Sequence, residues 1–90
     1  MEDESILDRI LYTYPEADFL TADGFDNAII GVDETTMRLI YSVTKCLQIL
    51  MDQGLPEDDA VEHFEFNVSG SYAGKRTPIW CYDNFYNTML

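Results

Sequence analysis

The strongest constraint on the fold is a pair of helix-period segments between residues 43 and 68, separated by Gly54-Leu55-Pro56. In the first segment apolar residues recur at i, i+3, i+4 and i+7, and in the second at i, i+1, i+4 and i+8. These positions are Val43, Cys46, Leu47 and Leu50, and then Ala60, Val61, Phe64 and Val68. Each segment therefore predicts a helix with one apolar stripe, and the rest of the chain must cover both stripes.

The ends of these two helices are also predicted by local residues. Ser42 is a suitable N-cap for a helix over residues 43–53. Gly54 follows as a residue able to adopt the left-handed conformation that ends a helix, and Pro56 suits the first turn of the next one.

The first fifteen residues predict a separate acidic helix. Apolar residues lie at positions 6, 7, 10, 11 and 14, and three acids at residues 2–4 suit the positive end of a helix dipole. Pro15 should end this helix, because the residue before a proline is disfavoured in the α conformation. Residues 16–27 then predict a loop rich in turn-forming residues.

Three apolar stretches predict a small sheet. Residues 28–32 form a continuous apolar run, as in a strand covered on both faces, and a four-residue connection leads to a second strand over residues 37–41. That short connection predicts an antiparallel hairpin. Residues 79–82 predict a third strand, which we expect to pair with residues 28–32 at the centre of the sheet.

Together these elements predict one α+β domain over residues 1–90, with a three-stranded antiparallel sheet. Residues 28–82 would form its core region, and residues 83–90 a tail that is partly ordered at best. The residues expected to be buried together are Leu47, Leu50, Phe64, Val68, Ile29, Ile30 and Trp80.

The charge of the chain restricts its partners. Seventeen acidic residues face five basic ones, for a net charge of −12, and the acids gather in residues 1–34 and 52–65. Nucleic acids and anionic membranes are recognised by Lys and Arg, so direct binding to either is not expected. The charge instead favours fast association with a basic protein surface, although solubility alone also explains an acidic composition.

The second acidic block predicts a partner-binding surface. Asp58, Glu62 and Glu65 follow the i, i+4, i+7 spacing of one helix face, and a row of like charges destabilises a helix slightly unless a cationic partner relieves it. The full predicted surface comprises Asp52, Glu57, Asp58, Asp59, Glu62 and Glu65. The simpler interpretation is that acids in the first turn of a helix only complement its dipole.

No catalytic, metal or cofactor pattern is present, so we expect neither an enzyme nor a bound cofactor. His63 is the single histidine, and Cys46 and Cys81 form no CxxC pair. The loop at 16–27 does not match calcium-loop spacing, and residues 70–77 do not match a phosphate-binding loop. With neither a leader pattern nor a membrane-spanning run, a cytoplasmic protein is expected.

A ligand-binding alternative rests on aromatic and basic residues near the C-terminus. Tyr72, Trp80 and Tyr82 could line a pocket, with Lys75 and Arg76 holding an anionic ligand. Such pockets often form at oligomer interfaces, so a homodimer is a second possible assembly of the chain.

Three stretches of the chain, DGFDNAIIGVD (23–33), MRLIYSVTKCLQILM (37–51) and HFEFNVSGSYAGKRTPI (63–79), carry a family pattern. The pattern resembles a family of small, mostly uncharacterised tailed-bacteriophage proteins, and it covers about residues 17–82. The resemblance implies a phage origin and a place in the cytoplasm of an infected bacterium.

A phage origin implies that a small acidic protein without catalytic residues acts by occupying a host protein. The first expectation is inhibition of a nucleic-acid-handling antiviral defence complex, of the anti-CRISPR or anti-restriction type, in which carboxylates stand where phosphates would bind. The alternatives are a ligand-sequestering anti-defence domain and a modulator of a host polymerase or regulator.

Overall fold

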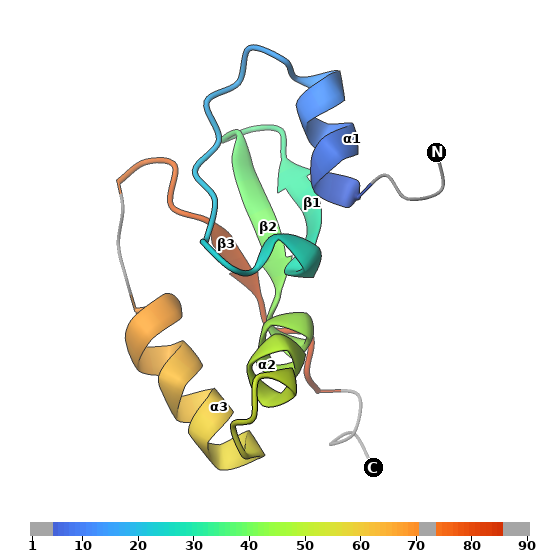
Figure 1. The fold of residues 1–90 in the computed structure, drawn as a ribbon. Coiled ribbons are helices and arrows are strands. Elements are labelled where there is room, and N and C mark those ends of the chain that lie inside the picture. The colour runs from blue at the N-terminus through green and yellow to red at the C-terminus, as the bar shows by residue number, and fades with distance from the viewer. Residues whose placement is uncertain (1–4, 71–73, 86–90) are drawn as a thin grey trace.

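The computed structural model describes residues 5–70 and 74–85, which form an α+β fold of helices around a three-stranded sheet (Figure 1). The helical elements are α1 (Ile6–Thr13), the 3-10 helix η1 (Asp26–Ala28), α2 (Val43–Asp52), α3 (Glu57–His63) and the π-helical turn η2 (Phe64–Val68). The strands are β1 (Ile29–Asp33), β2 (Arg38–Ser42) and β3 (Ile79–Cys81). Helices α2 and α3 lie together at one end of the sheet, and α1 lies beside β1.

Helix α1 begins and ends where local chemistry predicts. The Asp8 backbone N–H donates to Ser5 Oγ at 3.0 Å, and the Ser5 N–H donates to Asp8 Oδ2 at 3.3 Å. This reciprocal pair satisfies two N–H groups that a helix start leaves without partners. The helix stops at Thr13, two residues before Pro15, as predicted. The acids at residues 2–4 lie outside the described residues.

The turn between α2 and α3 also follows the prediction. Ser42 caps α2 by accepting the Lys45 backbone N–H at 3.1 Å. Gly54 has a φ of +108°, a left-handed conformation that a side chain would strain. Pro56 lies one position before the first residue of α3, so the two helices can pack against each other across a short connection.

The sheet is mixed, which corrects the predicted antiparallel arrangement. Strands β1 and β2 form the expected antiparallel hairpin, but β3 runs parallel to β2 rather than pairing with β1. The strand order is β1-β2-β3, so β2 is central and β1 lies at an edge. The reason is topological: the chain leaves β2 through α2 and α3, and a helical crossover brings the next strand back parallel.

The core gathers between the sheet, α1 and the helical pair. The predicted members Ile29, Leu47, Leu50 and Phe64 are buried, whereas Val68 and Trp80 are partly buried and pack against them. Ile30 is 38 % exposed, so its predicted burial is wrong, because a register shift between Ile29 and Gly31 accompanies its position in an edge strand. The helix positions Ile10, Val43, Cys46 and Ala60, which the apolar spacing predicted to face a partner, are also buried. Core residues that the prediction did not include are Phe25, Ala28, Leu39 and Tyr41.

The end of α3 widens into the π-helical turn. The Ser69 backbone N–H donates to the Phe64 carbonyl at 2.8 Å, a five-residue closure. Val68, four residues after Phe64, is partly buried and packs against the core. Gly70 follows, and a Cβ there would lie 2.9 Å from the Glu65 carbonyl oxygen, so the chain leaves the turn at a position that only glycine fits.

Candidate functional site

The acidic residues predicted to bind a partner are all exposed in the structure. They are Asp52 at the end of α2, Glu57, Asp58, Asp59 and Glu62 in α3, and Glu65 in η2. Two of the five basic residues make hydrogen bonds to backbone carbonyls away from these acids: Arg38 donates to the Thr77 carbonyl and Arg76 to the Asp18 carbonyl. We call the surface formed by Asp58, Glu62, Glu65 and their neighbours Glu57 and Asp59 the acidic face.

Fewer residues of α3 and η2 face the core than their apolar pattern predicts. Ala60 and Phe64 are fully buried, but Val61 is 39 % exposed and lies at the edge of the acidic face rather than in the core. Phe66 is 76 % exposed and follows Glu62 by four residues, so an aromatic ring stands among the carboxylates. The sequence analysis did not single out Phe66, although its offset of two residues from Phe64 places the two rings on different faces of a helix.

The aromatic and basic residues of the alternative ligand site are distributed over separate places. Trp80 packs inward, with its ring centroid 5.1 Å from that of Tyr41 and 5.4 Å from that of Phe64. The exposed Tyr82 donates its hydroxyl to Glu65 Oε2 at 3.2 Å. Lys75 and Arg76 are exposed and line a shallow hollow with Asp18, Phe19 and Leu20. Tyr72 lies outside the described residues.

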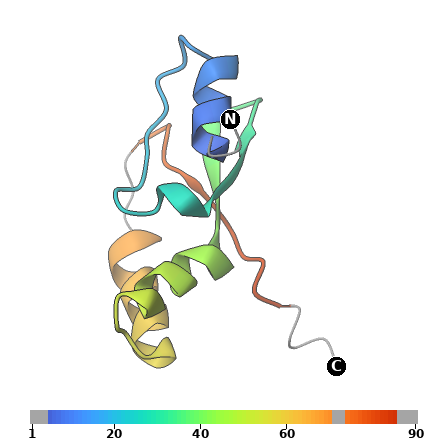
Figure 2. The ribbon, with the colours of Figure 1, turned by 45° about the vertical axis from the view of Figure 1, so that its right-hand side comes forward.

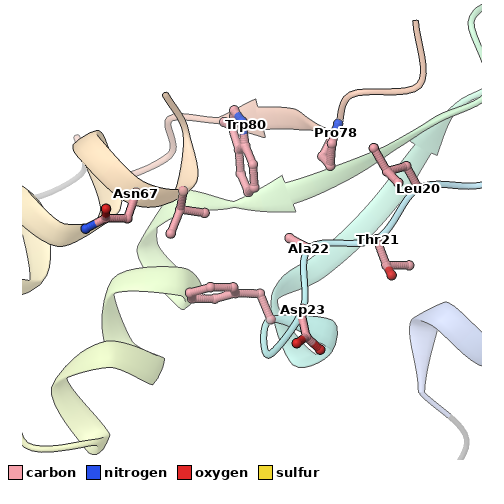
Figure 3. Close-up of a pocket in the computed structure, with 9 residues that line it drawn as sticks. Leu20, Thr21, Ala22, Asp23, Asn67, Pro78 and Trp80 are labelled. Atoms are coloured by element: carbon pink, nitrogen blue, oxygen red, sulfur yellow. The ribbon is translucent and has the colours of Figure 1, made fainter. Parts of the chain in front are cut away.

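Trp80 lines a different hollow, a pocket of about 350 Å³ between the loop before η1, the end of η2 and the start of β3 (Figure 3). Its apolar walls are Leu20, Ala22, Phe25, Val68, Pro78 and Trp80, and its polar lining residues are Thr21, Asp23 and Asn67. Figure 3 shows Trp80 and Pro78 facing the loop that carries Ala22, with Asn67 at one end. These segments are far apart in the sequence, so no local pattern indicated the pocket.

The sequence analysis also missed Asp83, which it placed in the tail. Figure 2 shows the chain after β3 running past the start of α2. There Asp83 Oδ2 accepts the Ser42 hydroxyl at 2.6 Å, and Oδ1 accepts the Thr44 backbone N–H at 2.9 Å. Partial burial alone would raise the pKa of Asp83, but these hydrogen bonds outweigh it and lower the pKa below its ordinary value. Asp83 thus fixes the segment after β3 to the start of α2.

Two further reactive side chains, Cys46 and His63, lie in different surroundings. Cys46 is buried in the core, and desolvation, followed by the charge of Asp83, raises its pKa to about 12. A thiol in this state is protonated at neutral pH and is a poor nucleophile. His63 is exposed, and its Nδ1 accepts the Asn67 side-chain amide at 3.3 Å.

The described residues contain neither a metal-binding cluster nor a membrane-spanning helix. No group of three or more His, Cys, Asp or Glu side chains there is placed to hold a metal ion. No helix in that part of the chain combines the length and the apolar character needed to cross a bilayer.

Comparison with known proteins gave no relative: no family model, no curated protein and no solved structure matches the chain.

Proposed function

We propose that this protein binds and blocks a basic surface on a host protein through the acidic face of α3 and η2. The observation that carries the proposal is the placement of Asp58, Glu62 and Glu65, which are exposed on the helix while Ala60 and Phe64 face the core. Like charges at i, i+4 spacing destabilise a helix by a few tenths of a kcal/mol per pair. A cationic partner would remove that cost on binding.

The exposed Phe66 supports a protein partner rather than a solvated surface. An aromatic ring 76 % exposed beside Glu62 and Glu65 offers a face on which a guanidinium group can stack while the carboxylates accept its N–H groups. Aromatic residues surrounded by polar ones are typical anchors of protein interfaces. Arginine is therefore the residue that we expect on the partner surface.

The class of target follows from the chemistry of such a surface. Arginine-rich surfaces commonly bind phosphates, and an acidic protein with a net charge of −12 competes with nucleic acid for them. Together with the resemblance to small phage proteins, this favours a nucleic-acid-handling antiviral defence complex of the bacterial host. In this proposal the protein acts by occupation of a surface, without a catalytic step.

The proposal is tested by capture from a bacterial lysate, with the triple variant Asp58→Asn, Glu62→Gln, Glu65→Gln as the perturbation. A matched control, Glu16→Gln, Asp18→Asn, Asp26→Asn, removes the same number of charges from exposed positions outside α3 and η2. We expect the wild type and the control to capture the same nucleic-acid-binding protein and the triple variant to lose it. Equal capture by the triple variant would contradict the proposal.

A further inference from the structure

The pocket beneath Trp80 lies apart from the acidic face and plays no part in the proposed function. We propose that it binds a small molecule that carries one aromatic ring and one positive charge. The pocket is built from three segments, the loop over residues 20–25, the end of η2 and the start of β3 (Figure 3).

The size of the pocket sets the size of the ligand. Its volume is about 350 Å³, roughly twice that of an apolar cavity of about 150 Å³ that accepts benzene. A single aromatic ring with a short side chain fits this volume. The value also lies at the lower end of the range of about 300–1,000 Å³ found for small-molecule sites.

The walls favour an aromatic ring. Trp80 and Phe25 contribute aromatic surface, and Leu20 and Pro78 contribute aliphatic surface. Trp80 is held in place by its ring contacts with Tyr41 and Phe64, both fully buried, and Phe25 is itself buried. A site whose walls are already fixed loses little conformational entropy when a ligand binds.

The charges around the pocket favour a cation. Asp23 is the only ionisable residue among those that line the pocket, and it lies exposed at the rim with its side chain pointing away from Trp80 (Figure 3). The hollow that contains Lys75 and Arg76 shares only Leu20 with it, so these bases do not line the pocket. A cation is attracted by Asp23, by the faces of aromatic rings and by the net charge of −12. An anion is repelled by Asp23 and by the net charge.

Three ligands that share a phenyl ring and differ in charge test the proposal: 2-phenylethylamine, 2-phenylethanol and 3-phenylpropionate. Trp80 is the single tryptophan of the chain, so a change in tryptophan emission reports directly on the pocket. We expect the amine to bind most tightly, the alcohol next and the carboxylate most weakly. The proposal is overturned if the amine leaves the emission unchanged up to roughly ten millimolar, or if the carboxylate binds as tightly as the amine.

Two variants assign the binding to this pocket. Asp23→Asn should weaken the amine about two- to fivefold, the worth of one exposed ion pair, and leave the alcohol unchanged. Glu16→Gln removes the same charge from an exposed residue outside the pocket and should leave all three affinities as in the wild type. If the two variants affect the amine equally, Asp23 does not recognise it and the proposal is wrong.

A third variant, Ala22→Leu, fills the pocket and should weaken both the amine and the alcohol at least tenfold. The Ala22 backbone N–H donates to the Tyr41 hydroxyl at 2.7 Å, a contact that the substitution leaves in place. Circular dichroism verifies that the variant is folded. A folded Ala22→Leu protein that binds the ligands as the wild type does would overturn the assignment. If Ala22→Leu fails to fold, the assignment is overturned when Asp23→Asn binds the amine as tightly as the wild type does.

Discussion

Replacing Asp83 by asparagine should loosen the contact between the segment after β3 and the start of α2. The wild-type carboxylate accepts the Ser42 hydroxyl at 2.6 Å and the Thr44 N–H at 2.9 Å. It also places a negative charge at a helix N-terminus, where the dipole favours it. Asparagine keeps one acceptor oxygen, so it can replace one of the two hydrogen bonds but not the charge.

The magnitude follows from these contacts. A hydrogen bond to a charged group contributes about 1.5–3 kcal/mol to stability. Because Asp83 is partly exposed, we expect the hydrogen bond that is lost to contribute an amount at the lower end of this range. We therefore expect Asp83→Asn to lower the free energy of unfolding by about 1–2 kcal/mol and Asp83→Ala by slightly more. For a domain of this size that is a substantial fraction of a total of about 5–10 kcal/mol.

The effect of Asp83 should also depend on pH. Because the pKa of the folded state is lowered, the stabilisation is fully present well above 3.8, the ordinary pKa of the carboxyl. This stabilisation is lost as the pH falls below 3.8 and through the lower pKa that Asp83 has in the folded protein. The wild type and Asp83→Asn should therefore differ in stability at neutral pH and converge in acid.

Urea unfolding of the two proteins, followed by circular dichroism at a series of pH values, measures this difference. Glu16→Gln is a matched control, because it removes the same charge from an exposed loop residue. The reasoning is refuted if Asp83→Asn unfolds at the same urea concentration as the wild type at neutral pH. A difference that persists unchanged in strong acid would refute the assigned role of the ionised carboxylate.

Three further outcomes are expected. Phe64→Ala should lower the free energy of unfolding by about 3–5 kcal/mol in urea melts, because a fully buried ring is removed from contact with Trp80; a loss below about 1 kcal/mol would place the ring outside the core. Phe66→Ala should change stability by less than about 0.5 kcal/mol but weaken capture of the host partner, and unchanged capture would exclude Phe66 from the interface. Cys46, buried with its pKa raised to about 12, should resist a thiol-alkylating reagent at neutral pH until the protein unfolds; mass spectrometry of the alkylated peptide would contradict this if Cys46 reacts as fast in the native protein as in urea.

The helices could be predicted from the sequence because their signals are local. Ser42 and Gly54 act within one turn of the residues whose conformation they set, and the apolar spacing of α2 directly encodes its buried face. The exposure of Asp58 and Glu62 followed from the same periodicity. The π-helical turn was not predictable in this way, since nothing in the spacing of Phe64 and Val68 distinguishes an α-helical turn from a wider one.

The sheet and the pocket depend on contacts between distant segments. The apolar run around Ile30 indicated a central strand, yet β2, with Leu39 and Tyr41 fully buried, holds that place. A strand reached through two helices was a signal for parallel pairing that the sequence analysis did not use. Asp83 caps a helix about forty residues earlier in the chain, and no local pattern reveals such a partner.

The proposed binding of the acidic face to a basic host surface should be visible in the rate of association with the captured host protein. Stopped-flow measurements would compare the wild type, the triple variant of Asp58, Glu62 and Glu65, and the matched control from about 0.05 to 0.15 M salt. We expect the wild-type rate to fall steeply with salt and the control to stay close to the wild type. The triple-variant rate should be slower at low salt and less dependent on salt. Equal rates and equal salt dependence for the wild type and the triple variant would contradict the proposed binding.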